Sequence, residues 1–291
     1  MSHNSQPAMA TPPPAGSVPV IPVIPHTPTP SQKSICIEYL SNSSNSSNSS
    51  NPPLPPLTFS SAFDSGNLSN VKQQPNTSTG PGEYHLYTAR DACDTVHEAP
   101  YSTWFHFSVF NTRVGQTLHM CIANMNKQSR LYKQDYRPFY KIVELLPDGS
   151  DGNDPNNWQR LPTPCSSSED KESSCMQLRF KFKFDCHFLQ QVKPGLEVKP
   201  GVTVDTAGAA PGTSPSDYIC GYKVYFAFCF PQSYTQSQTT LQAIDSAAPA
   251  LRTSNNIYYH REQLTSSLDG RRIELLTITD DHNLPPAESG E

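Results

Sequence analysis

A strict alternation of apolar and polar residues constrains the fold of this chain more than any other feature. In MQLRFKFKF, apolar side chains occupy every second position from Met176 to Phe184, and glutamine or basic side chains occupy the positions between them. Successive side chains of a β-strand point to opposite faces of the sheet. This spacing therefore predicts a strand with one face in a core and the other in water.

The same period of two recurs between Tyr84 and Pro231. Six further strand-like stretches lie in this segment: YHLYTA, TWFHFSVF, GQTLHMCIANM, PFYKIVELL, WQRLP and YKVYFAFCF, the last with apolar side chains on one face from Tyr222 to Phe230. Turn-rich segments such as LPDGSDGNDPNN separate them, and no helical pattern of ten or more residues does. Seven such strands predict antiparallel pairing in a mainly β domain, a β-sandwich or jelly-roll-like fold, over residues 58–232.

Composition divides the rest of the chain. Residues 1–57 combine proline-rich runs with SNSSNSSNSSN, and within them just SICIEYL has the character to pack, so we expect a disordered tail rich in Pro, Ser and Asn. Residues 191–217 are too poor in apolar side chains for a core and predict a surface insertion. Residues 233–256 predict a short helix capped by Ser233 and a polar linker. Residues 257–291 predict a β-hairpin, turning at LDGR, that opens a second domain.

The search for catalytic or metal-binding groups gives no assignment. His260 and Glu262 are two positions apart on a predicted strand, so their side chains share a face, but an ordinary strand face explains this pair better than joint metal ligation. None of the nine histidines begins His-x-x-Glu, and adjacent Cys186 and His187 point to opposite faces if their strand continues. Serine-hydrolase, phosphate-binding and dinucleotide-binding glycine motifs are absent from the sequence. We therefore predict no catalytic residue and no metal ligand in this chain.

One binding surface can be named from the residues. Arg179, Lys181 and Lys183 form a basic row on the outward face of the predicted strand. Such a row could attract an acidic peptide through charge and hydrogen bonds. Lysine and arginine are the usual occupants of an exposed strand face, so a simply solvated row is the favoured interpretation and binding of an acidic peptide is the alternative.

The sequence also limits where the chain can reside and which partners it can have. The first residues lack a basic secretory segment, and no stretch approaches the roughly 20 apolar residues that cross a bilayer. We therefore expect a cytosolic chain with its eight cysteines reduced and no membrane partner. The net charge of −5 argues against nucleic acid as a partner.

Five longer sequence motifs indicate a family. FDSGNLSNV, STWFHFSV, NMNKQSRLY, VYFAFCFPQSYTQSQ and IYYHREQLTSSLDGRRIELLTITD follow one another in this order. Through these motifs, residues 58–280 resemble the cytosolic carboxypeptidases. YYHRE with SLDGRR and LLTITD is similar to the type-five branch of that family.

The resemblance implies a β-rich amino-terminal domain joined to an α/β zinc carboxypeptidase domain. It also implies a substrate class, because members of the family remove glutamates from polyglutamylated proteins such as tubulin, with an expected location in the cytosol or at microtubules. The family holds its zinc with a His-x-x-Glu motif and a later histidine, and this sequence contains no such motif. Zinc is thus expected for the full-length family, and none is expected on this chain.

Two functions from different classes remain. In the first, the chain is the front part of a zinc carboxypeptidase whose catalytic site lies in a missing continuation. In the second, it is a non-catalytic β-domain that binds tubulin or another acidic partner. The first is favoured because a chain ending after an opening hairpin leaves Ile273, Leu275 and Ile278 without packing partners.

Overall fold

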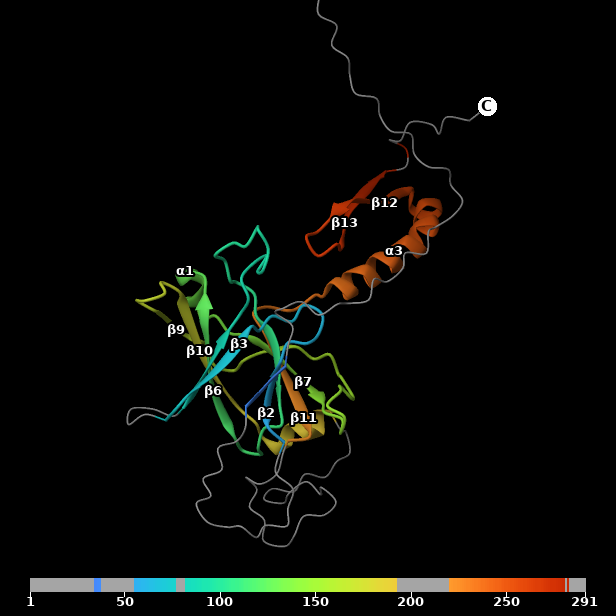
Figure 1. Ribbon diagram of the computed structural model, residues 1–291. Coiled ribbons are helices and arrows are strands. Elements are labelled where there is room, and N and C mark those ends of the chain that lie inside the picture. Colours follow the sequence, from blue (N-terminus) through green and yellow to red (C-terminus); the bar gives the residue numbers. More distant parts are fainter. Residues whose placement is uncertain (1–33, 38–54, 77–81, 193–219, 281, 283–291) are drawn as a thin grey trace, which may run out of the picture.

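A computed structural model describes residues 34–37, 55–76, 82–192, 220–280 and 282. These residues form a two-layered β-sandwich, with a long helix and a β-hairpin at one end of it (Figure 1). The predicted mainly β fold is confirmed. Most of the predicted tail and nearly all of the predicted insertion lie outside the described residues.

The first layer is a six-stranded, fully antiparallel sheet. Its order is β1 (Ser34–Ile37), β2 (Leu57–Ser60), β5 (His106–Phe110), β11 (Tyr222–Ala227), β7 (Phe139–Glu144) and β8 (Gln159–Arg160). β1 pairs with β2 from Ser34 opposite Ser60 to Ile37 opposite Leu57. A disordered tail over residues 1–57 is therefore wrong for β1, and the sandwich takes in Leu57, which is 1% exposed.

The second layer is a five-stranded sheet with one parallel pair. Its order is β3 (Asn70–Gln74), β4 (Glu83–Tyr87), β6 (Thr117–Met125), β10 (Met176–Lys183) and β9 (Ser166–Glu169). The prediction of purely antiparallel pairing is wrong for β4 and β6, which run in the same direction. The intervening strand β5 belongs to the other layer, so the chain crosses the sandwich and returns in its original direction.

Aromatic side chains fill the space between the layers. β10 alternates buried and more exposed residues as predicted, with Met176, Leu178, Phe180 and Phe182 in the core. The ring of Phe226 on β11 lies 5.5 Å from that of Phe107, 5.7 Å from Phe180 and 5.3 Å from Phe182, measured between centroids. Burial of one such side chain stabilises the fold by roughly 1.5–3 kcal/mol. These contacts join β5, β10 and β11 across the two layers.

Strand β11 is buried on both of its faces. On the outer face, Asp151 in the loop after β7 accepts hydrogen bonds from Lys223 Nζ at 2.7 Å and from the Tyr225 hydroxyl at 2.5 Å. The strand ends at Ala227, so the predicted apolar face reaching Phe230 is wrong at its end. Phe230 lies beyond the strand and is 59% exposed.

Three short helical turns complete the sandwich. They are α1 (Ser129–Tyr132) after β6, and the 3₁₀ turn η1 (Cys186–Phe188) followed by α2 (Leu189–Val192) after β10. Cys186 and His187 therefore lie in a helical turn, and the strand continuation considered for them does not occur.

The helix after the sandwich, α3 (Tyr234–Asn255), is longer than predicted. It begins with the expected cap, because Ser233 Oγ accepts a hydrogen bond from the Gln236 amide at 3.1 Å and the Gln236 side chain accepts one from the Ser233 amide. The predicted linker over residues 246–256 is wrong, since the helix runs to Asn255. Serine and threonine hydroxyls in this part donate hydrogen bonds to carbonyls of the preceding helical turn, as Ser254 does to Ala250. These side chains therefore do not end the helix where the linker was predicted.

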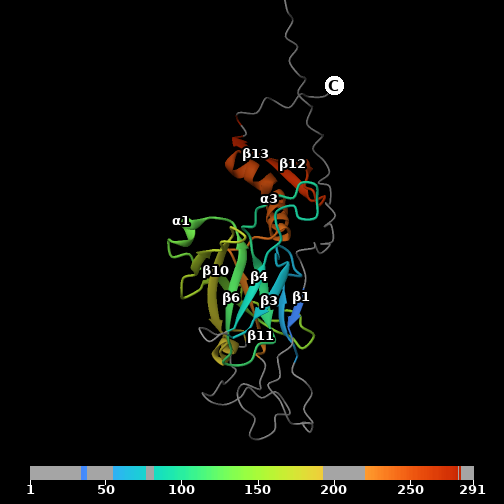
Figure 2. The ribbon, with the colours of Figure 1, turned by 60° about the vertical axis from the view of Figure 1, so that its left-hand side comes forward.

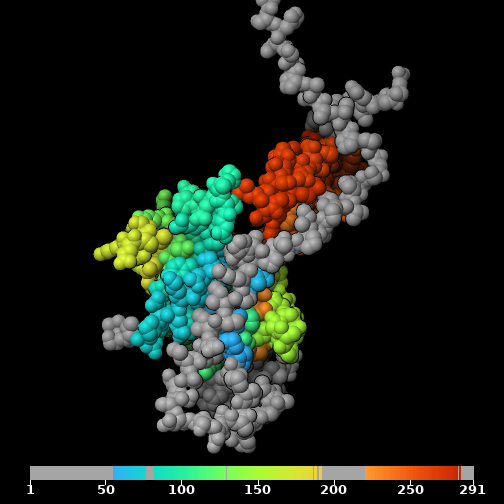
Figure 3. Space-filling view, in the orientation of Figure 1, coloured from blue at the N-terminus to red at the C-terminus, as the bar shows by residue number. Residues whose placement is uncertain are grey.

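The chain then forms the predicted hairpin. β12 (Ile257–Ser266) pairs antiparallel with β13 (Arg272–Asp280), and the loop between them contains Gly270 at a φ of 72°. Figures 1 and 2 show the hairpin beside α3 at one end of the sandwich, and the space-filling view of Figure 3 shows this part in red at the same end. No helix in the described part of the chain is both long and apolar enough to cross a bilayer.

Ion pairs join the hairpin to α3. Arg261 on β12, whose side chain is 4% exposed, lies 2.8 Å from Asp245 of α3 and 2.8 Å from Glu274 of β13. The Tyr259 hydroxyl donates to the same Asp245 carboxylate at 2.9 Å. The motif IYYHRE thus places two polar side chains, Tyr259 and Arg261, on the face of β12 that contacts α3.

Candidate functional site

The predicted basic row lies together on the outer face of β10, as its spacing requires. Arg179 is engaged within the fold, because its guanidinium contacts Glu83 at 3.3 Å and donates to Ser168 Oγ at 2.7 Å. Lys183 pairs with Asp185 at 3.1 Å. Lys181 is exposed and has no carboxylate partner among the described residues. Two of the three cations are thus partly neutralised, and binding of an acidic partner by Arg179, Lys181 and Lys183 stays a prediction.

His260 and Glu262 lie on β12, two positions apart. His260 stacks on Tyr258 with ring centroids 6.5 Å apart, and Glu262 is exposed opposite Leu275. Within the described ranges, the set of metal-capable side chains that the structure brings together does not include either residue. His187 contacts Asp185 at 3.4 Å.

A small cavity of about 160 Å³ lies where the sandwich meets the start of α3. It is lined by Phe63, Asp64, Ser65, His106, Lys141, Asp151, Trp158, Tyr225, Pro231, Ser233 and Gln236. Asp64 of the motif FDSGN accepts a hydrogen bond from the Thr235 amide at 2.8 Å and contacts Arg271 at 3.4 Å. Burial by itself would raise the pKa of Asp64, but hydrogen bonds from Thr235, Ser233 and Arg271 together lower it. A carboxylate at this point therefore anchors the helix and the hairpin loop to the sandwich.

The glycine of FDSGN is required by close packing. A Cβ at Gly66 would come within 2.1 Å of the Ser61 carbonyl oxygen. Ser65 before it has a φ of 65°, and its carbonyl accepts a hydrogen bond from Trp104 Nε1 at 2.8 Å. The tight turn brings Ser65 Oγ to 3.1 Å from His106 Nδ1.

The pair of Ser65 and His106 has the atoms of a nucleophile and a base, but its electrostatics oppose that use. Burial, assisted by the charge of Lys141, lowers the pKa of His106 to about 3. A general base works best with a pKa near the operating pH, so this imidazole is a poor acceptor of a serine proton. Its Nε2 is buried and has no hydrogen-bond partner among the residues that the structure describes. The cavity is therefore better suited to hold a neutral imidazole in place than to perform hydrolysis.

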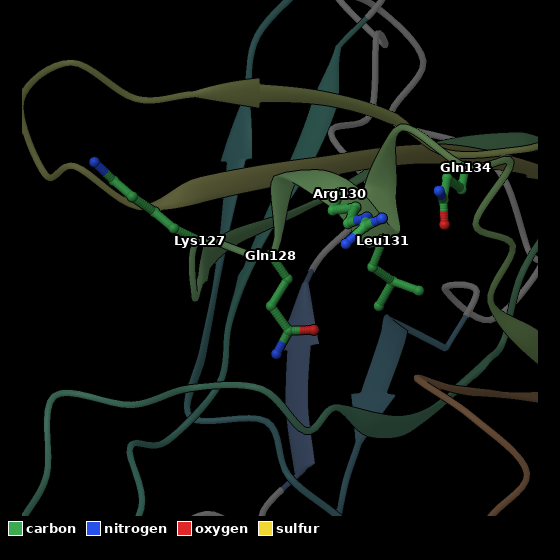
Figure 4. Close-up of a pocket in the computed structure, with 5 residues that line it drawn as sticks. All are labelled: Lys127, Gln128, Arg130, Leu131 and Gln134. Atoms are coloured by element: carbon green, nitrogen blue, oxygen red, sulfur yellow. The ribbon is translucent and has the colours of Figure 1, made fainter.

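A second, open hollow of about 450 Å³ lies against α1 (Figure 4). It is lined by Lys127, Gln128, Arg130 and Leu131 of the motif NMNKQSRLY and by Gln134, which follows that motif. Lys127 pairs with Glu169 of β9 at 2.5 Å. The hollow presents one further cation, Arg130, at the surface.

Sequence reasoning missed a cluster on the outer face of the five-stranded sheet. Glu83 and His85 of β4 and Cys121 of β6 each offer a ligand atom, and these atoms lie within 4.8 Å of one another. Burial raises the pKa of the Cys121 thiol to about 12, with Arg179 acting in the opposite direction. The spacing of Glu83 and His85 was a usable signal, whereas the addition of Cys121 depends on the parallel register of β4 and β6.

The sequence comparisons with known proteins agree on one family. Residues 59–189 match the family model of the cytosolic carboxypeptidase N-terminal domain. The chain is similar to cytosolic carboxypeptidase-like protein 5 of Rattus norvegicus, with 31% identity over 252 residues, covering 78% of this chain and 25% of that protein. It is also similar to cytosolic carboxypeptidase 6 of Mus musculus, with 26% identity, covering 78% of this chain and 32% of that protein. A metallo-carboxypeptidase from Burkholderia cenocepacia aligns with a TM-score of 0.41, 15% identity and coverage of 81% of this chain and 42% of that one.

The fold and the two sequence matches define an amino-terminal β-sandwich domain of the carboxypeptidase type. Residues 59–189 form a cytosolic carboxypeptidase N-terminal domain, and over 78% of its length the chain is similar to a cytosolic carboxypeptidase-like protein. The match spans about a quarter of the length of its type-five relatives.

Proposed function

We propose that this chain supplies the amino-terminal domain of a cytosolic zinc metallocarboxypeptidase that removes glutamates from polyglutamylated proteins such as tubulin. The match of residues 59–189 to the family's N-terminal domain is the observation that carries the proposal. Similarity to cytosolic carboxypeptidase-like protein 5 over 78% of the chain extends it through α3 and the hairpin. Tubulin, the cytosol and glutamate removal enter from the family resemblance.

The described residues support an organising role in place of a catalytic one. Neither His260 with Glu262 nor Ser65 with His106 forms a catalytic arrangement, so we assign no residue of this chain to the family's zinc and no catalytic step. The hairpin instead exposes six large apolar side chains over its two faces and its turn, Leu264, Leu268, Ile273, Leu275, Leu276 and Ile278. Exposed apolar side chains gathered on one element are typical of a surface that packs against more protein. We propose that the catalytic unit packs there.

Reading the transcript past codon 291 tests the proposal. A reading frame that continues into a His-x-x-Glu motif supports it. A stop codon directly after codon 291, together with a stable 291-residue protein in cells, contradicts it.

The alternative is a non-catalytic module that binds an acidic partner, favoured by the exposed Lys181 and the neighbouring cations of the basic row. Binding of a glutamylated tubulin-tail peptide should weaken with added salt and with Lys181→Glu. Lys171→Glu, an equal charge change in the exposed turn between β9 and β10, is the matched control. Equal loss in both variants would show general charge attraction and sink the assignment to the row.

A further inference from the structure

Strand register brings three chemically different ligand groups to one spot on the outer face of the five-stranded sheet. His85 on β4 stands opposite Cys121 on β6, and Cys121 stands opposite Arg179 on β10. Glu83 is two positions before His85, so both side chains leave β4 on the same face. Figure 2 shows β4, β6 and β10 side by side in this layer.

The side chains of this cluster already contact one another. Glu83 Oε2 lies 2.8 Å from His85 Nε2, and the ligand atoms of Glu83, His85 and Cys121 lie within 4.8 Å of each other. The side chains of His85 and Glu83 are 19% and 21% exposed, while Cys121 is fully buried beneath them. A sheet backbone fixes the positions from which all three project. The cluster is therefore partly shielded from water and held on rigid elements.

One imidazole nitrogen, one carboxylate and one thiol make a donor set suited to zinc. Zinc binds nitrogen, oxygen and sulfur donors in a tetrahedral arrangement at roughly 2.0–2.3 Å, which sets its ligands about 3.3–3.8 Å apart. Small side-chain adjustments bring atoms within 4.8 Å of one another to that spacing. Harder cations such as magnesium and calcium prefer oxygen donors alone.

We propose that Glu83, His85 and Cys121 form a binding site for a zinc-class divalent cation. The ion bonds to His85 Nε2, to a Glu83 carboxylate oxygen and to the Cys121 sulfur. The thiol proton leaves to solvent as the sulfur–metal bond forms, and a water on the outer side completes the tetrahedron. The carboxylate and thiolate together balance the two positive charges of the ion.

Arg179 acts on this site as a positioning residue. Its guanidinium contacts Glu83 at 3.3 Å and is held in turn by Ser168. A carboxylate bonded to such a partner keeps its orientation, and this kind of support is typical of protein metal sites. Lys72, opposite His85 on β3, places its ammonium over the Tyr87 ring at 5.3 Å and so is drawn to a different partner.

Cobalt titration of the reduced 291-residue chain tests the site. A cobalt–thiolate bond gives a near-ultraviolet charge-transfer absorption that nitrogen and oxygen ligands do not give. The parent chain should show this absorption with one equivalent of Co²⁺, and Zn²⁺ should displace it. Cys121→Ser should abolish it. His85→Gln, at a side chain that is 19% exposed, should weaken Zn²⁺ binding at least about tenfold, because loss of an indirect supporting residue alone costs roughly that much.

Matched controls separate this site from scattered thiols and histidines. Cys229→Ser, at an exposed cysteine, and His97→Gln, at an exposed histidine, should leave the absorption and the zinc affinity unchanged. Failure of Cys121→Ser to fold would leave His85→Gln as the deciding variant. An absorption that persists in His85→Gln with unchanged zinc affinity, or no absorption in the parent chain, would overturn the proposal. Neither result bears on the proposed peptidase.

Discussion

The guanidinium of Arg261 lies 2.8 Å from the carboxylate of Asp245, and this contact joins the hairpin to α3. A second carboxylate, Glu274, lies equally near on the other strand. Arg261→Met keeps much of the side-chain volume but leaves both acids without their shared cation. We expect the free energy that holds the hairpin against α3 to fall by roughly 3–5 kcal/mol, because removal of one partner of a buried ion pair leaves the remaining charge without compensation.

Hydrogen exchange of the β12 and β13 amides measures this loss locally. Arg130→Met removes an exposed cation on α1 and is the matched control, with exchange of the hairpin expected at the parent rate. Unaltered exchange in Arg261→Met would contradict the assigned role of the ion pair.

The same network predicts acid sensitivity of the hairpin. Burial would raise the pKa of Glu274, but hydrogen bonds and charge from Arg272 and Arg261 outweigh it and hold the pKa below the ordinary 4.5. Since the folded state binds this proton less tightly than the unfolded state, the stabilisation is present above pH 4.5 and is lost as pH falls through the lowered value. Hairpin exchange should accelerate over that window in the parent chain. Glu274→Gln should be less stable at neutral pH and show a flatter acid response, and a parallel response in both proteins would refute the assignment.

The aromatic core makes a paired prediction from two phenylalanines only a few residues apart. Phe226 is fully buried among Phe107, Phe180 and Phe182, whereas Phe230 is 59% exposed. Phe226→Ala should destabilise the sandwich by about 3–5 kcal/mol through lost burial and a new cavity. Phe230→Ala should cost well under about 1 kcal/mol. Urea unfolding of both variants measures the difference, and similar midpoints would contradict the packing described for β11.

His106 should remain neutral through the physiological range. Burial, with Lys141 nearby, lowers its pKa to about 3. A histidine whose folded pKa lies below the unfolded value contributes stability above pH 6.5 that is lost progressively below it. Its imidazole proton resonances should show no titration between about pH 5 and 8. His106→Gln assigns the resonance by removing it. A titration of that resonance near neutral pH would contradict the burial described for the His106 imidazole.

The fold was predictable where one face of a strand is core and the other is water. β10 is the clearest case, because Phe180 and Phe182 alternate with charged residues. β9, with the sequence SSSE, lies at an edge and has no apolar side chain to reveal it. The far half of α3 was hidden for another reason, since serine, threonine and proline favour turns unless the hydroxyls bond back within the helix, as Ser254 does.

The candidate sites depended on contacts between distant parts of the chain. Glu83 and His85 share a face by spacing alone, but Cys121 joins them through the one parallel pair of strands, which the antiparallel expectation excludes. The spacing of Arg179, Lys181 and Lys183 placed the row correctly on one face. Its partial neutralisation by Glu83 and Asp185 required the tertiary fold.

The central proposal is that this chain supplies the amino-terminal part of a zinc carboxypeptidase and that no peptidase site lies within its 291 residues. Glutamate release from a polyglutamylated tubulin-tail peptide, measured with and without a chelator, tests it most directly. The 291-residue chain alone should release no glutamate, and the protein encoded by the continued reading frame should release it in a chelator-sensitive way. Chelator-sensitive release by the 291-residue chain would contradict the account.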